Sequence, residues 1–275
     1  MKNKFDAIVI GLGAMGSAAI YQLAKRGKTV LGIDQFSPPH HYGSTHGECR
    51  IIRKAVGEGD QYVPLVLRSY ELFREIEKET GSELLTITGG LTLESWQSDA
   101  VMHARHNFLD QTIRCAQKFN IRHEILESQD IKKRYPQFAV TNERGYFEYD
   151  TGYLRPERCI EAQLRLAQSY NATIQTHERV ISIAPSGNSE VRIRTSGGGY
   201  AAEKVIVTAG PWISEFLPPA YSQFFKVYRQ VMYWFKIRDQ LQSTFTRTVS
   251  YLHMDFQKGP KFWFLRIPVA GWKDN

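Results

Sequence analysis

Phe5 to Gly16 reads FDAIVIGLGAMG, and this stretch decides the fold of the first part of the chain. Its first half is a short apolar run with β-branched residues, which is typical of a buried strand. The run leads into Gly11, Gly13 and Gly16, a Gly-x-Gly-x-x-Gly turn. The first glycine of such a turn permits a tight bend, the second lets the backbone approach a pyrophosphate, and the third lets helix and strand pack closely. The stretch therefore predicts the start of a dinucleotide-binding βαβ unit.

The residues that follow extend this prediction. Ser17 to Arg26 has helical character, and Thr29 to Ile33 is a second strand pattern that ends at Asp34. The helix N-terminus offers free N–H groups and a positive dipole end to phosphates. Asp34 stands where a ribose-binding acid is expected in such a unit. A purely structural turn with an incidental aspartate is the alternative, but the order of strand, turn, helix, strand and acid favours a nucleotide site.

The composition is that of a globular protein, and its positive net charge fits an anionic cofactor or substrate. The 275 residues are 42% hydrophobic and 23% charged, and the formal net charge is +7. No apolar run approaches the length of a membrane span, and the N-terminal lysines precede a glycine turn rather than a signal-peptide cleavage site. We therefore expect a cytoplasmic protein without a membrane partner. Basic residues are dispersed among acids, which favours an anionic cofactor or substrate over nucleic acid.

Cysteine and histidine residues suggest neither a disulfide framework nor a metal centre. Cys49, Cys115 and Cys159 are odd in number and widely separated, and we expect them to be buried small hydrophobic residues. His40, His41 and His46 share one loop but have no carboxylate or cysteine partners at ligand spacing. No metal is expected.

Gln35 to Arg50 is predicted to be a loop, because it is rich in proline, glycine and small hydroxyl residues. Gly47 to Arg53 has the appearance of the start of a short helix. On that helix Arg50 and Arg53 would lie three residues apart and share a face. Two arginines after a nucleotide-binding unit form a candidate site for an anionic group.

The rest of the chain has a mixed α/β pattern. Helices are predicted over 62–80, 99–119 and 130–135 and from 155, and strands within 84–93, 145–154, 173–176, 179–184, 190–195, 200–209, 224–237, 249–256 and 262–267. The alternation of strand and helix stops after two strands and resumes near residue 150, unlike a nicotinamide-binding Rossmann domain. We predict a Rossmann-like βαβ domain (1–86 and 147–217) intertwined with a second domain (87–146 and 218–275) built on a largely antiparallel sheet with helices.

Five segments together carry a resemblance to a known family: GLGAMGSAA, GSTHGECRIIR, GEGDQYVPLVLRSYELF, GYLRPE and VIVTAGPW. They resemble the monomeric sarcosine oxidase and N-methyltryptophan oxidase family, within the D-amino-acid-oxidase-like flavoproteins. The similarity runs with few gaps from residue 5 to about residue 235, and its first hundred residues are the most specific part. On this resemblance the first predicted domain binds FAD and the second binds substrate.

The resemblance implies an FAD enzyme, monomeric, that oxidises a secondary or N-methyl amine of a small amino acid bearing a carboxylate. The product is an imine that water hydrolyses, and dioxygen takes the electrons to give hydrogen peroxide. The residues that match family positions at the cofactor are Gly11, Gly13, Met15, Gly16, Asp34, Ser44, Thr45, Arg50, Val180, Ala209, Gly210 and Trp212.

Three residues match catalytic positions of the family. His46 belongs to the loop along the flavin, Arg50 matches an arginine close to the flavin ring, and Arg53 matches the arginine that holds the substrate carboxylate. A guanidinium is chemically suited to that last role, because its N–H fork pairs with a carboxylate.

Two departures from the family qualify this expectation. Cys49 stands where the family has threonine, which removes a hydroxyl contact to the flavin. Family members also continue well beyond Asn275, so the resemblance implies either a fragment or truncated product or a chain with a redesigned end. The part that is missing relative to the family includes the oxygen-activating lysine, the flavin-linking cysteine and a glycine-rich flavin segment. Lys273 does not match the lysine motif. A non-catalytic nucleotide-binding protein is therefore one alternative function, and an NAD(P)-dependent dehydrogenase, disfavoured by the interrupted alternation, is another.

Overall fold

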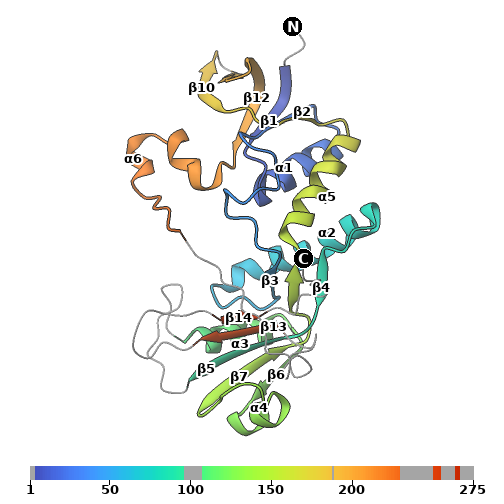
Figure 1. Ribbon diagram of the computed structural model, residues 1–275, viewed down its shortest axis with the longest axis vertical. Helices are drawn as coiled ribbons and strands as arrows, with labels where there is room; N and C mark the ends of the chain where they lie inside the picture. Colours follow the sequence, from blue (N-terminus) through green and yellow to red (C-terminus); the bar gives the residue numbers. More distant parts are fainter. Residues whose placement is uncertain (1–3, 96–106, 188, 230–249, 255–263, 267–275) are drawn as a thin grey trace, which may run out of the picture. The chain divides into compact units, whose positions relative to one another are not determined.

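The computed structural model describes residues 4–95, 107–187, 189–229, 250–254 and 264–266 (Figure 1). The chain has the predicted mixed α/β fold and divides into two compact units, each assembled from separate segments. The first comprises Met1–Glu48, Ile76–Leu84 and Arg155–Tyr233, and the second comprises Cys49–Glu75, Leu85–Leu154 and Trp234–Asn275. Among the described residues, no helix combines the length and apolar character that crossing a membrane requires.

The first unit is built on a six-stranded sheet of order β10-β11-β12-β1-β2-β9. Its strands are β1 (Lys4–Ile10), β2 (Val30–Ile33), β9 (Thr173–Gln175), β10 (Val180–Ser186), β11 (Glu190–Thr195) and β12 (Gly199–Val207). β1 is parallel to β2 on one side and to β12 on the other, and β9 is parallel to β2. β10, β11 and β12 form an antiparallel meander at the other edge. The predicted strand–helix–strand start is therefore the centre of this sheet.

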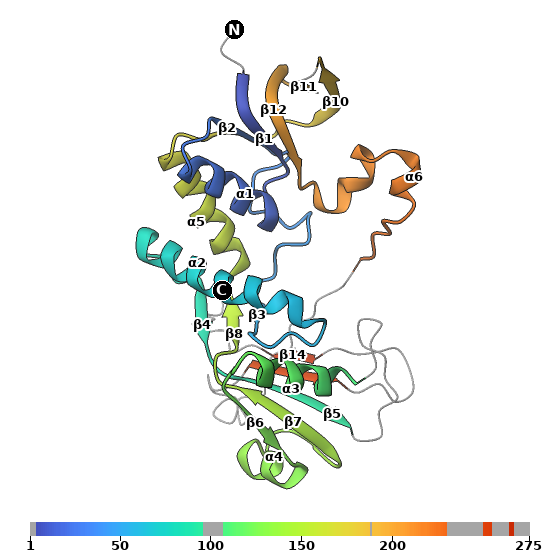
Figure 2. The ribbon, with the colours of Figure 1, turned by 180° about the vertical axis from the view of Figure 1, so that it is seen from behind.

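Helices α1 (Ala14–Lys25) and α5 (Pro156–Ser169) lie side by side in this unit (Figures 1 and 2). The Ser17 hydroxyl on α1 donates a buried hydrogen bond of 2.7 Å to Oε1 of Gln163 on α5. The core of the sheet consists of buried aliphatic side chains, namely Ile8, Ile10, Leu31, Ile33, Val180, Ile193 and Ala202. After β12 the chain forms the 3-10 helix η2 (Gly210–Phe216) and the short helix α6 (Pro219–Ser222).

The second unit contains two sheets. A three-stranded sheet has the order β3-β8-β4, and a five-stranded sheet has the order β14-β13-β5-β7-β6. Their strands are β3 (Arg50–Ile52), β4 (Leu85–Ile87), β8 (Gly152–Leu154), β5 (Gly90–Ser95), β6 (His123–Leu126), β7 (Glu143–Glu148), β13 (Ser250–Met254) and β14 (Phe264–Arg266). All described pairings here are antiparallel except that of β13 with β5. The largely antiparallel character agrees with the sequence pattern.

Helices α3 (Phe108–Lys118) and α4 (Ser128–Arg134) cover opposite faces of the sheet formed by β5, β7 and β6 (Figures 1 and 2). Adjacent residues of β7 show this alternation. Tyr146 packs in a cluster with Leu109 of α3, whereas Phe147 packs in a cluster with Ile131 of α4. Helix α2 (Val63–Thr80), preceded by the 3-10 helix η1 (Asp60–Tyr62), contributes its first part to this unit and its last turn to the other.

Two predicted elements are wrong. The segment Gly47–Arg53 does not begin a helix, because Arg50–Ile52 forms strand β3 against β8. Its isoleucines favour extended structure, and pairing with Gly152–Leu154 overrides the helical spacing of the arginines. Residues 224–229 are not part of a strand, and the rest of the predicted strand 224–237 lies outside the described residues.

The remaining differences concern boundaries. The predicted helix over 99–119 is described only as Phe108–Lys118, and residues 99–106 lie outside the described part. The compact units also place Cys49–Glu75 in the second unit, whereas the predicted cofactor domain ran to residue 86. The assignment of the units to cofactor and substrate roles stays a prediction.

The β1 core should dominate the stability of the first unit. Ile8 is fully buried in β1, whereas Ile181 of β10 is 50% exposed. We expect Ile8→Ala to lower the free energy of unfolding by about 2–5 kcal/mol, because it removes buried methyl groups and leaves a cavity. The matched change Ile181→Ala should cost less than about 1 kcal/mol. Urea denaturation followed by circular dichroism measures both, and equal losses would contradict this placement of the core.

Candidate functional site

The turn between β1 and α1 is packed so closely that two of its positions exclude any side chain. A Cβ on Gly11, where φ is +86°, would lie 2.5 Å from the carbonyl oxygen of Thr208. A Cβ on Gly16 would lie 1.8 Å from the carbonyl oxygen of Gly11. The Thr208 hydroxyl lies 2.7 Å from that same oxygen and 3.0 Å from the carbonyl oxygen of Ile10. Glycine at these two positions is therefore a steric requirement.

Gly13, in contrast, faces open space. It is the N-cap of α1 and provides no side-chain hydrogen bond to the first turn of the helix. A Cβ built on Gly13 would meet nothing closer than Oγ1 of Thr45, at 3.8 Å. The N-terminus of α1 is thus left without a side-chain cap beside an open volume, which is the arrangement that binds phosphate groups at helix N-termini.

Asp34 lies at the end of β2 and is only 6% exposed. Its Oδ2 accepts a hydrogen bond of 2.7 Å from the Leu12 N–H in the glycine turn, and its Oδ1 accepts one of 2.8 Å from the Phe36 N–H. Nε2 of His40 is 3.7 Å from Oδ1. Each carboxylate oxygen has more than one acceptor position, so Asp34 can fix the turn and still accept a ribose hydroxyl.

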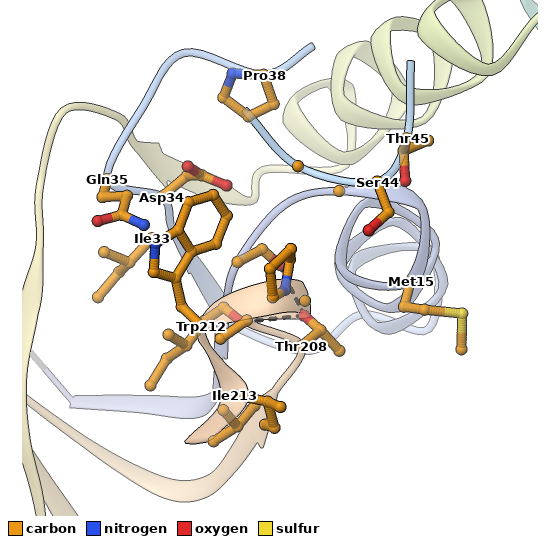
Figure 3. A pocket seen from close by; sticks show the side chains of 18 of the residues that line it. Met15, Ile33, Asp34, Gln35, Pro38, Ser44, Thr45, Thr208, Trp212 and Ile213 are labelled. Carbon is orange, nitrogen blue, oxygen red and sulfur yellow. Dashed lines mark hydrogen bonds between the residues drawn. The ribbon is translucent and has the colours of Figure 1, made fainter. Parts of the chain in front are cut away.

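A cavity of about 580 Å³ opens above this turn (Figure 3). In the figure Asp34 and Gln35 lie on one side of the cavity, and Ser44 and Thr45 lie on the other. The predicted cofactor residues that line it are Gly11, Gly13, Met15, Asp34, Ser44, Thr45, Val180, Ala209, Gly210 and Trp212. Gly16 does not line the cavity, because it faces the backbone of Gly11. The structure thus brings together ten of the residues that the sequence placed at the cofactor.

Aromatic contacts hold the proline-rich loop that forms one wall of the cavity. The centre of the Phe36 ring lies 5.6 Å from the ring centre of Trp212 in η2. It lies 4.9 Å from the ring centre of His40 and 4.6 Å from that of Tyr42. Sequence reasoning did not place Phe36 or His40 at the site, although both belong to the loop directly after Asp34. Their position beside the predicted ribose acid was the available signal.

Glu178 and Thr208 were also missed. Glu178 lines the cavity, is 8% exposed, and its backbone N–H donates 3.0 Å to the carbonyl oxygen of Asp34. Its carboxylate accepts hydrogen bonds from Thr195 and, at 3.2 Å, from the Tyr200 hydroxyl. Burial and then this hydrogen bond raise the pKa of Tyr200. No sequence motif marked Glu178, because its contacts come from strands that are adjacent only in the folded sheet.

The loop that carries His46 is attached to helix α5. The Glu157 carboxylate in the first turn of α5 accepts hydrogen bonds from the N–H groups of Gly47, at 2.6 Å, and Glu48, at 3.2 Å. Glu48 has a φ of +66°, which is unfavourable for a side-chain-bearing residue. The Glu157 contact offsets that strain, so the path of the chain after His46 is fixed by α5.

The three predicted catalytic residues do not line the cavity. His46 is half-buried in the first unit, whereas Arg50 and Arg53 belong to the second. Nη1 of Arg50 donates 3.1 Å to the carbonyl oxygen of Cys49. Nη2 of Arg53 lies 2.7 and 2.8 Å from the two carboxylate oxygens of Glu58. The catalytic roles of these three residues stay predictions.

The cysteines agree only in part with expectation. Cys115 and Cys159 are buried, whereas Cys49 is half-buried beside Arg50 in sequence. Burial raises the pKa of the Cys159 thiol to about 12, so this thiol stays protonated and unreactive near neutral pH. Within the described residues, no group of three or more His, Cys, Asp or Glu side chains is arranged to hold a metal ion.

Residues 6–257 match the model of the FAD dependent oxidoreductase family. The chain belongs to this family, whose cofactor is FAD. The site fits that cofactor, because the closed glycine turn, the uncapped N-terminus of α1 and the buried carboxylate of Asp34 are the groups that a dinucleotide requires. The expected membership of an FAD-dependent oxidoreductase family is confirmed.

Curated relatives include amine oxidases. The chain is 42% identical over 238 residues to monomeric sarcosine oxidase of Bacillus sp. (strain B-0618), a match that covers 86% of this chain and 59% of that protein. It is 39% identical over 215 residues to N-methyl-L-tryptophan oxidase of Yersinia pestis (strain Pestoides F), covering 78% and 56%. The chain thus spans less than two thirds of the length of these relatives.

Solved structures share the fold. NikD, described as an unusual amino acid oxidase essential for nikkomycin biosynthesis, matches with a TM-score of 0.68 at 26% identity, over 78% of this chain and 53% of that one. Glycine oxidase from Geobacillus kaustophilus matches with a TM-score of 0.65 at 21% identity, over 77% and 56%, which supports the fold alone.

The two helix-proximal glycines give a direct test of the cofactor site. Gly13→Ala adds a methyl group to space that the protein leaves open, so we expect unchanged thermal stability but at least about tenfold weaker FAD binding, equivalent to about 1.4 kcal/mol. Gly16→Ala should lower both the thermal stability and the FAD affinity, because its methyl group collides with the Gly11 carbonyl. Flavin fluorescence titration and thermal unfolding separate the two effects. If Gly13→Ala binds FAD as tightly as the wild-type chain, the pyrophosphate does not lie beside Gly13.

Proposed function

We propose that the protein oxidises a secondary or N-methyl amino acid and passes the electrons to dioxygen. The amine loses two electrons and two protons from its C–H and N–H bonds and becomes an imine, which water hydrolyses. Dioxygen takes up the electrons and protons as hydrogen peroxide. The FAD would supply the two-electron acceptor, held by the glycine turn, α1 and Asp34. The sarcosine and N-methyltryptophan oxidases among its relatives support this class of substrate.

The observation that carries the proposal is the state of Arg53. Its guanidinium already holds a carboxylate, that of Glu58, through Nη2 alone. Nε of Arg53 is buried and has no hydrogen-bond acceptor among the described residues. The guanidinium carbon also lies 5.7 Å from the centre of the Phe108 ring. The Nη2 contact shows that this guanidinium binds a carboxylate in the fold, and a substrate carboxylate would use the same chemistry.

Glu58 acts in this proposal as an internal stand-in for the substrate carboxylate. It lies between Gly57 and Gly59, the second of which has a φ of +156°. The ion pair has side-chain exposures of 22% for Arg53 and 29% for Glu58, so it is partly accessible to solvent. A substrate would exchange one carboxylate for another at the same guanidinium, which conserves charge at the site.

The general experiment is to record the absorption spectrum of the purified chain before and after denaturation. Flavin that stays with the protein after denaturation indicates covalent attachment, and released flavin indicates tight non-covalent binding. Peroxide production is then measured with sarcosine, N-methyltryptophan, proline and pipecolate. A colourless protein that cannot be reconstituted with FAD would overturn the proposed function and favour a chain without oxidase activity.

Arg53→Ala tests the carboxylate role directly. We expect KM for sarcosine to rise by about 30-fold or more, because truncating one partner of a hydrogen-bonded charge pair costs about 2–5 kcal/mol. Arg68→Ala is the matched control, since Arg68 is 53% exposed and pairs on the surface of α2 with Glu71 and Glu75. Steady-state peroxide assays give both values. An unchanged KM in Arg53→Ala would end the assignment.

Glu58→Gln tests the exchange of carboxylates. Removing the internal charge relieves the competition for Arg53, so KM for sarcosine should fall by a few-fold relative to the wild-type chain. Glu75→Gln, which removes a carboxylate that is 42% exposed on α2, should leave KM unchanged. A rise in KM for Glu58→Gln would mean that Glu58 supports the arginine instead of competing with the substrate.

A further inference from the structure

A buried glutamate lies next to the backbone of the proposed substrate-binding arginine. Glu148 is the last residue of β7 and is 1% exposed. Its Oε1 accepts hydrogen bonds from the Lys54 N–H, at 2.7 Å, and from the Thr151 hydroxyl, at 3.0 Å. Its Oε2 accepts from the Ala55 N–H, at 3.0 Å, and from the Tyr146 hydroxyl, at 2.9 Å. Both oxygens are thus saturated by four donors.

Two of these donors are the backbone N–H groups directly after Arg53. Strand β3 ends at Ile52, which pairs with Gly152, so the sheet no longer fixes the backbone at the next residue. Beyond the end of the β3–β8 pairing, the Glu148 carboxylate accepts the backbone hydrogen bonds instead. It substitutes for a pairing strand, and because it is buried and charged it accepts backbone N–H groups more strongly than a neutral acceptor does.

A second set of contacts restrains the residues on either side of Arg53 in the sequence. The Tyr70 hydroxyl lies 3.2 Å from the carbonyl oxygen of Ile52 and 2.8 Å from that of Asp150. Nζ of Lys54 forms a 2.6 Å ion pair with Asp150. The residues before and after Arg53 are therefore both tied to the turn between β7 and β8, and the arginine side chain projects from a fixed support.

Electrostatics agree with this geometry. Burial raises the pKa of Tyr70 and of Tyr146, and for both the charge of Glu148 raises the pKa further while the charge of Arg53 lowers it. Both hydroxyls consequently remain protonated across the physiological range and available as donors. The Tyr70 and Tyr146 hydroxyls can therefore keep donating to their backbone and carboxylate acceptors.

We propose that Glu148 is a positioning residue for substrate recognition: its carboxylate holds the Lys54 and Ala55 backbone so that the Arg53 guanidinium is presented to the carboxylate of the substrate. This inference rests on the proposed function. The alternative is that Glu148 only stabilises the second unit, as any satisfied buried carboxylate does. The positioning role and the stabilising role predict different results. If Glu148 positions Arg53, its loss impairs substrates that carry a carboxylate and spares those that do not.

The test compares Glu148→Gln with Glu143→Gln in the FAD-loaded chain. Glu143 begins the same strand, is 7% exposed, and accepts hydrogen bonds from the N–H groups of Thr141, at 2.6 Å, and Asn142, at 3.0 Å. It makes none of the contacts to the Arg53 segment. In Glu148→Gln the amide NH₂ replaces one carboxylate oxygen and must face donors that this oxygen accepted. The contact with either the Lys54 or the Ala55 N–H is therefore lost. Both variants are similar perturbations of a buried strand end.

The readouts are KM and kcat for sarcosine, the rate with N-methylbenzylamine, which has no carboxylate, FAD affinity and thermal stability. Misplacing the arginine should raise KM for sarcosine by about ten- to a hundredfold. The rate with N-methylbenzylamine and the affinity for FAD should match those of Glu143→Gln. Hydrogen exchange at the Lys54 and Ala55 amides should accelerate in Glu148→Gln only.

Each outcome decides between the possibilities. Equal sarcosine KM values in Glu148→Gln and Glu143→Gln would overturn the positioning role and leave the proposed function intact. A wild-type chain that neither takes up FAD nor produces peroxide would overturn the proposed function and, with it, this inference. If Glu148→Gln does not fold, the same comparison is made with Glu148→Asp, which keeps the charge but shortens the side chain. A sarcosine KM equal to wild type in that variant would contradict the positioning role of Glu148.

Discussion

The cavity of the first unit depends on the close approach of α1 to the end of β1. The Cβ position of Gly16 is occupied by the Gly11 carbonyl, and that carbonyl is also contacted by Thr208 at the end of β12. Asp34, at the end of β2, also accepts a hydrogen bond from the Leu12 N–H in this turn. Three parallel strands therefore end at one small turn, and the cavity above it has the shape that their ends impose.

Two carboxylates that line the cavity are held in place by hydrogen bonds within the protein. The Asp34 oxygens are already engaged by backbone N–H groups, and the Glu178 carboxylate is engaged by Thr195 and Tyr200. A ligand entering the cavity meets a prearranged surface whose side chains are held by the protein itself. Such preorganisation lowers the entropic cost of binding a large, flexible dinucleotide.

The sequence was most informative where local sterics decide the structure. The glycine turn, α1 and β2 follow from residues within about thirty positions of one another, which together form a recognisable motif. Strand β3 was mistaken for a helix because its partner, β8, lies about a hundred residues further along the chain. Pairing partners at that distance leave no periodic signal in the strand itself.

The same reason applies to the site. The cavity residues predicted by resemblance lie in segments whose motifs are contiguous, such as the loop ending at Thr45 and the strand end at Ala209. Glu58 and Glu148 were not singled out. A glutamate beside glycines or at a strand end has no distinctive sequence pattern. Its contact with Arg53 or with the Lys54 backbone exists only in the folded chain.

The interleaving of the two units has a consequence for how the chain reaches its native state. The backbone passes from one unit to the other after residues 48, 75, 84, 154 and 233, and β1 pairs with β12, where Lys4 is aligned with Ala201. During synthesis from the N-terminus, β1 must wait for nearly two hundred residues before its second neighbour exists. Contacts of such long range slow folding and leave an apolar strand edge exposed meanwhile. Until β12 is made, the β1 edge that will pair with it has no partner in the sheet, so the sheet of the first unit is completed only late in synthesis.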